Sequence, residues 1–223
     1  GPLYETFDDV PVVSISDSQR EPLPQARYVA TVPHGLPPRL LLPGFGAGGY
    51  LAFLGRISPE KAPDAAIRIA AAAGMPLKIA AKVDKVDREY FVERIEPMLD
   101  AAHVEFIGEI GDDEKSEFLG NAAGLLFPIA WPEPFGLVMV EAMACGAAVL
   151  TTHRLSLPEV GGDAVAYTEP DSASIGTALS GLIADEPRRR ALGAAAHARS
   201  LEFTWEASAQ AHLVAYTRAV SGD

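Results

Sequence analysis

Short apolar runs alternate with helical segments over residues 50–185, and no other feature of the chain constrains its fold as strongly. Because strands joined by helices at this spacing run parallel, the alternation predicts an α/β fold with a Rossmann-like parallel sheet and helices on both faces. The expected strands are Tyr50–Leu54, Leu77–Ala81, Val104–Gly108, Gly124–Pro128, Ala147–Thr151 and Val165–Tyr167. Helices are expected over residues 64–73, 87–99, 112–119, 137–144, 171–185, 187–199 and 204–220, and a loop over 157–162.

The net charge of −12 argues against nucleic acid and against an anionic membrane surface as partners. The 223 residues are 48% hydrophobic and 22% charged, as in an ordinary soluble globular protein. The one cysteine, Cys145, excludes an internal disulfide, and no run approaches the roughly 18 apolar residues of a membrane span. We therefore expect a cytoplasmic protein that builds any anion site locally, from a few basic residues and helix ends.

Residues 124–146 predict a strand, an irregular loop and a helix, and they carry two glutamates eight residues apart. Prolines exclude regular structure after the strand until Gly136, which has no side chain to block a close approach. Glu133 lies on the loop and Glu141 about one turn inside the helix. The helix start offers free N–H groups to a phosphate, and the carboxylates can accept hydrogen bonds from hydroxyls on either side. A nucleoside diphosphate sugar has this layout; two solvated glutamates without a ligand are the alternative.

The first strand of the sheet runs into Gly55–Lys61, a loop with the sequence Gly-Arg-Ile-Ser-Pro-Glu-Lys that enters a helix. Arg56 and Lys61 can converge on one side of this loop, which makes them candidates for phosphate binding in so acidic a chain. A pair of solvated charges is the alternative. Lys82 is a weaker candidate at the carboxyl end of the next strand. Asp112 is expected to be the N-cap of the helix that follows it.

The segments Gly55–Lys61 and Glu133–Glu141 resemble two elements of the retaining glycosyltransferases of family 4. These enzymes have the GT-B fold, which consists of two Rossmann-like domains, and the second segment resembles their E-x7-E element. The resemblance extends over nearly the whole chain. It implies that the chain is the C-terminal, nucleotide-sugar-binding half of such an enzyme.

The resemblance also implies a role for individual residues. Arg56 and Lys61 would grip the donor diphosphate and Glu133 would contact the donor sugar, so these three are the expected catalytic residues. Glu141 would hold the ribose. The other expected donor-binding residues are Ile110, whose backbone would hold the base, Asp112 beside it, and the helix-start residues Phe135, Gly136, Leu137 and Val138. No Asp-x-Asp motif is present, so we expect no metal, and no cofactor beyond the donor substrate.

By the same resemblance the chain divides into four parts. These are a remnant of the N-terminal acceptor-binding domain (1–30), the interdomain linker (31–49), the donor-binding domain (50–204) and a terminal helix that packs back toward the N-terminal domain (205–223). If the resemblance holds, the remainder of the N-terminal domain would have been truncated, would have been cleaved or would be a separate chain. His34 is expected to be a turn residue, and Glu159 to have a structural role.

The expected activity is transfer of a sugar, with retention of configuration, from a nucleoside diphosphate sugar to an unknown acceptor. UDP-sugar is the favoured donor and GDP-sugar the next. The alternative is a donor-binding module or fragment that is inactive unless it is joined to the missing N-terminal domain. An epimerase of the same fold would need several catalytic acids and histidines across the cleft, and these are not evident. The expected partners are the donor and the missing domain, with no nucleic acid and no membrane contact.

Overall fold

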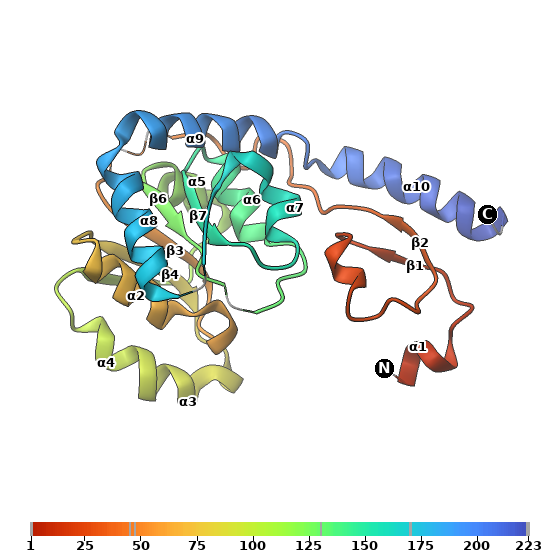
Figure 1. Ribbon diagram of the computed structural model, residues 1–223, viewed down its shortest axis with the longest axis horizontal. Coiled ribbons are helices and arrows are strands. Elements are labelled where there is room, and N and C mark those ends of the chain that lie inside the picture. The colour runs from red at the N-terminus through yellow and green to blue at the C-terminus, as the bar shows by residue number, and fades with distance from the viewer. Residues whose placement is uncertain (1, 45, 47, 130, 170, 222–223) are drawn as a thin grey trace.

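A six-stranded parallel sheet forms the centre of the computed structural model, which describes residues 2–44, 46, 48–129, 131–169 and 171–221 (Figure 1). The strand order is β5-β4-β3-β6-β7-β8. These strands are β3 (Leu51–Arg56), β4 (Leu77–Lys82), β5 (Val104–Gly108), β6 (Gly124–Leu126), β7 (Val149–Thr152) and β8 (Ala166–Thr168). The predicted α/β fold is therefore confirmed.

Helices cover both faces of this sheet, as predicted (Figure 1). Alternate side chains of β3 point to opposite faces, so that Ala52 joins one apolar cluster and Phe53 the other. The helices are α2 (Pro63–Ala72), α3 (Arg88–Tyr90), α4 (Glu96–Leu99), α5 (Asp112–Gly120), α6 (Leu137–Ala144), α7 (Leu157–Gly161), α8 (Ser172–Ala184) and α9 (Glu186–Ser200). α2 and α8 pack together on one face, and α6 and α9 on the other. None of the described helices is both long and apolar enough to cross a membrane.

The strand order reverses between β3 and β6. From β3 the chain continues outward to β4 and β5, and it then returns to β6 and continues outward on the other side to β7 and β8. In open parallel sheets, ligands bind outside the carboxyl ends of the strands at this kind of reversal. The loops that leave β3 and β6 are the two segments that the sequence singled out.

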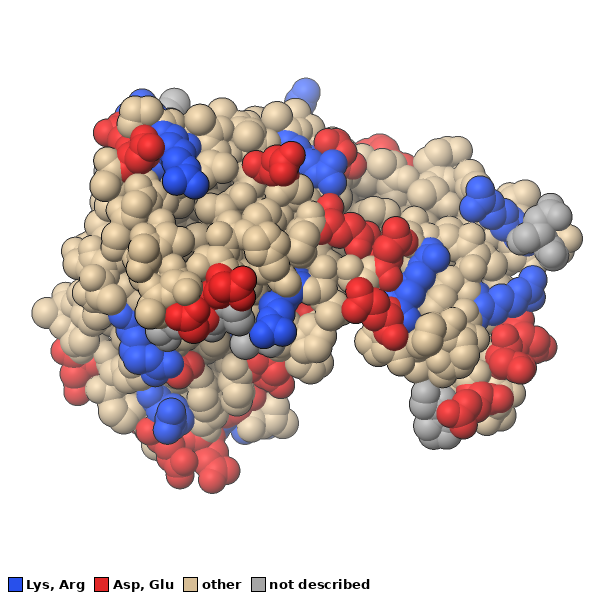
Figure 2. Space-filling view, in the orientation of Figure 1, with Lys and Arg blue, Asp and Glu red and all other residues tan. Residues whose placement is uncertain are grey.

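A smaller lobe lies beside the main body (Figure 1). It contains α1 (Pro2–Thr6), the parallel strands β1 (Val12–Ser14) and β2 (Tyr28–Thr31), and α10 (Trp205–Ser221), which contacts β2. Leu36 bridges to Thr204 where the two connections to the lobe meet. Figure 2 shows the molecule hollowed between the lobe and the main body, with acidic and basic side chains interspersed on this face. Phe45 and Ala47 of the expected linker lie outside the described residues, and the four-part division of the chain stays a prediction.

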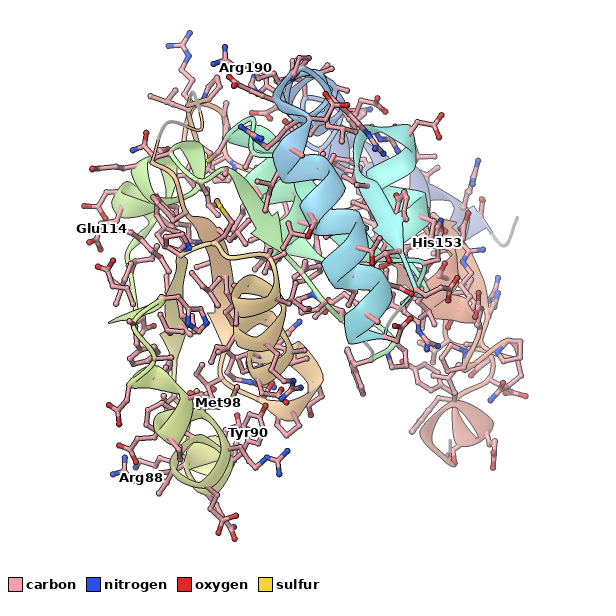
Figure 3. The ribbon with its side chains drawn as sticks, turned by 60° about the vertical axis from the view of Figure 1, so that its left-hand side comes forward. Arg88, Tyr90, Met98, Glu114, His153 and Arg190 are labelled. Atoms are coloured by element: carbon pink, nitrogen blue, oxygen red, sulfur yellow. The ribbon has the colours of Figure 1, made fainter. Side chains whose placement is uncertain are left out.

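Three local predictions differ from the structure. Asp112 is the first residue of α5 and not its N-cap, which is Gly111; the Gly111 N–H donates to Glu114 Oε2 at 2.9 Å, and Glu114 lies at the start of α5 (Figure 3). The expected loop over 157–162 contains α7, one helical turn with a proline in its first turn. The helix expected over 87–99 has π geometry from Phe91 to Ile95, because Pro97 lacks an N–H and crowds the preceding turn.

The short 3-10 helices are η1 (Ser18–Arg20), η2 (Pro59–Lys61), η3 (Lys85–Asp87) and η5 (Gly162–Ala164).

Candidate functional site

A cavity of about 310 Å³ opens at the carboxyl end of the sheet where the strand order reverses. One side comes from the loop after β3 and the other from the loop after β6 together with the start of α6. The smaller lobe and the connection from it supply the rest of the wall. The lining residues are Ile15, His34, Lys61, Phe127, Glu133, Pro134, Phe135, Gly136, Leu137 and Val138. Of the predicted site residues, Lys61, Glu133 and all four helix-start residues therefore share one cavity.

Lys61 and Glu133 meet across this cavity although they come from different loops. The Lys61 Nζ lies 2.5 Å from Glu133 Oε2, and the ammonium lies 5.8 Å from the centroid of the Phe127 ring. Glu133 is only 7% exposed, so its charge needs a partner, and Lys61 supplies one. The second carboxylate oxygen, Oε1, accepts a hydrogen bond from the Gly136 N–H at 3.3 Å. The site thus holds a buried carboxylate, a cation and the beginning of a helix within contact distance of one another.

The start of α6 is open toward the cavity. Gly136 has a φ of +85° as the N-cap residue, and a Cβ there would lie 3.1 Å from Leu157 Cδ2. The backbone angle favours glycine, and the space beside it is tight for any side chain. The amides of Leu137 and Val138 have no recorded acceptor in the part of the chain that the structure describes. Free amides at a helix start attract anions.

Hydroxyl groups hold the irregular loop that carries Glu133. Thr151 Oγ1 donates to the Phe127 carbonyl at 3.0 Å, and Thr152 Oγ1 donates to the Ile129 carbonyl at 2.7 Å. Two further hydroxyls bind the next part of the loop: Ser156 Oγ donates to the Glu133 carbonyl at 2.6 Å, and Ser16 Oγ to the Pro134 carbonyl at 2.7 Å. A buried loop without secondary structure must satisfy its carbonyls in this way. None of these hydroxyls was singled out from the sequence; the neighbouring threonines at the end of a predicted strand were the available signal.

Glu141 lies one turn beyond Leu137 on α6 and is not part of the cavity wall. Its Oε1 lies 2.8 Å from the Nζ of Lys115, which also lies 2.8 Å from Asp112 Oδ1. Burial alone would lower the pKa of Lys115, but the hydrogen bonds to Asp112 and Glu141 outweigh it and the pKa is raised. Lys115 is consequently a charged partner of Glu141, and the sequence analysis did not assign it any role in the site.

Arg56 does not line the cavity. Its half-exposed guanidinium points to the exit of the neighbouring strand β4, with Nε 3.4 Å from Asp87 Oδ2 and NH1 4.0 Å from Asp84 Oδ2. Lys82, which pairs with Arg56 in the sheet, lies 3.3 Å from Asp84. The recorded ion pairs of Arg56 and Lys61 therefore lie on different segments.

Ile110 and Asp112 lie beyond the end of β5, at the start of α5. The Ile110 side chain is partly buried and packs against the sheet core, while Asp112 is exposed and pairs with Lys115. Their part in holding a base stays a prediction.

His34 and Ile15 also line the cavity; the sequence predicted His34 as a turn residue, but it lies in an irregular segment without a turn, and Ile15 was given no role. The His34 ring lies edge-on to Phe135, with ring centroids 5.1 Å apart, and also contacts Trp205 at 6.3 Å. Burial lowers the pKa of His34, and the nearby His212 lowers it further. The His34 ring packs against the loop residue Phe135, which is a structural role. No local pattern connects residues 15 and 34 with the motif 100 residues later, because only the return of the lobe brings them there.

A larger cavity, of about 490 Å³, lies beside Ala123 and Ala148, which precede β6 and β7. It is therefore at the opposite end of the strands, and none of the predicted site residues lines it. Among the described residues, no group of three or more His, Cys, Asp or Glu side chains could hold a metal ion.

Comparison with known proteins matches residues 46–199 to the family described as glycosyl transferases group 1. The chain is also 30% identical, over 179 residues, to the D-inositol 3-phosphate glycosyltransferase of Mycobacterium bovis (strain BCG / Pasteur 1173P2) and to that of Mycobacterium tuberculosis (strain ATCC 25177 / H37Ra). Each match covers 76% of this chain but 37% of the relative. The chain thus spans little more than a third of the length of these curated relatives.

Two of the solved structures that this chain resembles match it over nearly its whole length. Sucrose-phosphate synthase from Thermosynechococcus elongatus matches with a TM-score of 0.82 and 21% identity over 96% of this chain and 59% of that one. Anabaena Alr3699/HepE, solved in complex with UDP and glucose, matches with a TM-score of 0.78 and 21% identity over 98% of this chain and 65% of that one. At 21% identity, these two matches establish that the fold is shared and nothing more.

Proposed function

The chain belongs to the glycosyl transferases group 1, the family 4 enzymes of the GT-B fold, and from this premise we propose that its cavity binds the nucleoside diphosphate sugar of a retaining glycosyltransferase. The observation that carries the proposal is the ion pair between Lys61 and Glu133 beside the open start of α6. A cation and free amides on one side suit a diphosphate, and a buried carboxylate suits the hydroxyls of a sugar.

In this proposal Lys61 and the amides at the start of α6 stabilise the diphosphate as it departs. Electrostatic stabilisation of a leaving group is commonly the largest catalytic contribution, and loss of one such contact typically costs about 3 kcal/mol. Glu133 orients the sugar. When the donor binds, the ion pair between Lys61 and Glu133 is replaced by contacts of Lys61 and of Glu133 with the donor. Arg56 joins the diphosphate by exchanging its long contacts with Asp84 and Asp87, at 4.0 and 3.4 Å. No metal is required, because the cations and the helix start neutralise the leaving group.

The nucleoside would extend from the cavity along α6. Glu141 lies on the same face of α6 as Leu137, one turn further on, and binds the ribose hydroxyls. The base reaches the backbone at Ile110, with Asp112 nearby. UDP-sugar is the proposed donor and GDP-sugar the next, and the complex of Anabaena Alr3699/HepE with UDP and glucose supports the first choice.

The acceptor site belongs to a second Rossmann-like domain in this proposal. α10 carries exposed apolar side chains that such a domain would cover: Leu213 (59% exposed), Val214 (46%) and Tyr216 (59%). The segments 1–30 and 205–223 would then form the junction with it, and 31–49 the linker.

Calorimetric titration with UDP, GDP and ADP, first without metal and then with Mg²⁺, tests the donor site. We expect metal-free binding of one nucleotide, lost in Glu141→Ala and retained in Glu109→Ala, an exposed residue outside the cavity. Binding that requires Mg²⁺, or that survives Glu141→Ala, would contradict the proposed arrangement.

A second candidate function is a donor-binding module that has no activity alone. The observation that favours it is the length of the match, since the chain spans 37% of the curated relatives. A transferase assay with and without the acceptor-binding half distinguishes the two: the module binds the nucleotide alone but transfers sugar only when the other half is present.

A further inference from the structure

We infer that Lys115 is a positioning residue that presents the Glu141 carboxylate to the ribose of the bound nucleotide. The inference rests on the proposed function. Lys115 lies on α5 and Glu141 on α6, so their contact depends on how the two helices pack and not on the spacing within either one. Neither residue lines the cavity itself; Glu141 lies one turn along α6 from Leu137, which does.

The contact is short and largely shielded from solvent. The Lys115 Nζ lies 2.8 Å from Glu141 Oε1, and the two side chains are 18% and 13% exposed. The ammonium is held on its other side by Asp112 Oδ1, also at 2.8 Å. Lys115 is thus fixed between two carboxylates and cannot swing freely, so it restricts the rotamer that Glu141 adopts.

Only one oxygen of Glu141 is occupied by this contact. No hydrogen bond of Oε2 is recorded within the described residues. A carboxylate whose first oxygen is anchored and whose second is free can accept hydrogen bonds from a pair of vicinal hydroxyls without having to become ordered first, which lowers the entropic cost of binding. The ribose 2′- and 3′-hydroxyls are such a pair.

Lys115 also reduces the electrostatic repulsion between Glu141 and a bound diphosphate in the proposed site. Glu141 lies one turn from the helix start that would receive the diphosphate, and an unpaired carboxylate there would repel it. The adjacent ammonium, which Glu141 shares with Asp112, reduces that repulsion. Removal of Lys115 should therefore weaken nucleotide binding both by loosening Glu141 and by exposing its charge to the ligand.

The test measures UDP and 2′,3′-dideoxy-UDP binding by calorimetry, with the guanine or adenine pair used instead if the unmodified chain prefers that base. Lys115→Met should weaken UDP binding by about tenfold, which is the usual effect of losing one charge-assisted hydrogen bond. Lys78→Met is the matched control: it removes the same charge and another Lys–Glu pair, Lys78 with Glu105 at 3.1 Å, on strand β4. The control should bind UDP as the unmodified chain does.

Two further readouts separate positioning from a merely structural effect. The weakening caused by Lys115→Met should shrink for 2′,3′-dideoxy-UDP, which lacks the hydroxyls. In a Glu141→Gln background, Lys115→Met should add little, because Lys115 acts through Glu141. If Lys115→Met does not fold, two other variants carry the test. Lys115→Gln can still donate to the Glu141 carboxylate, and the double variant Lys115→Met with Glu141→Gln has no unpaired carboxylate.

The outcomes distinguish the inference from the function on which it rests. No binding of UDP, GDP or ADP by the unmodified chain would overturn the proposed function and the inference together. Nucleotide binding that Lys115→Met leaves unchanged, or weakens equally for the dideoxy ligand, would overturn the inference alone. So would additive effects of the Lys115 and Glu141 substitutions.

Discussion

The Glu159 carboxylate accepts two contacts from the backbone N–H of Asp17, at 2.8 and 3.0 Å, although 142 residues separate them in the chain. The Ser18 N–H donates to the same carboxylate at 3.2 Å, so Glu159 satisfies the start of η1 in the smaller lobe. The neighbouring Ile15 and Ser16 contact the candidate site, one as a cavity residue and the other through the Pro134 carbonyl. Glu159 thereby ties the lobe to α7, beside the separate contact that Ser16 makes with the loop that carries Glu133.

Glu159→Ala should destabilise the chain by about 1–2 kcal/mol, because several backbone N–H groups lose a charged acceptor. Urea unfolding measures this difference. The control is Glu109→Ala, which removes an exposed carboxylate from the exit of β5. Equal unfolding midpoints for the two variants would show that the connection contributes nothing to stability.

Lys61→Ala should lower the turnover of an intact enzyme that includes the acceptor-binding half by roughly 100-fold, the loss typical of one stabilising contact to a leaving group. Glu109→Ala should have little effect on the same assay. Equal rates for the two variants would count heavily against the proposal that Lys61 stabilises the leaving diphosphate.

Lys61→Ala should also destabilise the chain, by about 1–3 kcal/mol, because it leaves the largely buried Glu133 carboxylate without its cation. Adding Glu133→Gln should restore stability without restoring turnover. Thermal unfolding of the single and double variants checks this; a double variant as unstable as Lys61→Ala would show that the unpaired charge is not the cause.

Gly136→Ala should destabilise the chain by about 1–2 kcal/mol and weaken nucleotide binding, because the new Cβ is strained at a φ of +85° and lies 3.1 Å from Leu157 Cδ2. Gly176→Ala in α8 is the matched control. A Cβ at Gly176 meets nothing within 4 Å, so alanine should raise stability by up to about 1 kcal/mol. Chemical denaturation of both variants should give shifts of opposite sign.

Ser156→Ala should cost about 1–2 kcal/mol, because it leaves the buried Glu133 carbonyl without its hydroxyl donor. Ser180→Ala provides the comparison, since Ser180 donates to the Gly176 carbonyl on the exposed side of α8. Ser180→Ala should change the free energy of unfolding by no more than about 0.5 kcal/mol, as most surface substitutions do. A similar loss for both would mean that the site loop does not depend on the hydroxyl.

Stability should fall as the pH decreases below about 6.5, the usual pKa of histidine. The pKa of His34 is lowered in the folded chain, so the unfolded chain binds the proton first and the free energy of unfolding decreases as the pH falls toward the folded pKa. Urea unfolding between pH 7.5 and 5 measures the slope. His34→Asn, which keeps a polar side chain before Gly35, should flatten this slope, and an unchanged slope would assign the effect to other groups.

Much of the site could be predicted because its residues lie in short segments. Lys61, Glu133 and Gly136 occupy loops that leave adjacent strands, and parallel strands bring such loops to one edge of the sheet. The hydroxyls of Thr152 and Ser156 could not be predicted in the same way, because nothing near them in the chain shows which carbonyls they will meet. The N-cap of α5 was misplaced by one residue because Gly111 and Asp112 are both favourable there and the Glu114 side chain decided between them.

The alternation of strands and helices, the parallel sheet and the two loops that carry Lys61 and Glu133 can be predicted from the sequence, because these follow from local apolar patterns and turn residues. The partner of each charged group is known only from the folded chain. Lys115 meets Glu141 because α5 packs beside α6, and Arg56 turns to Asp87 because the segment after β4 folds back toward β3. Such pairings depend on the three-dimensional path of the chain, for which no local pattern is sufficient.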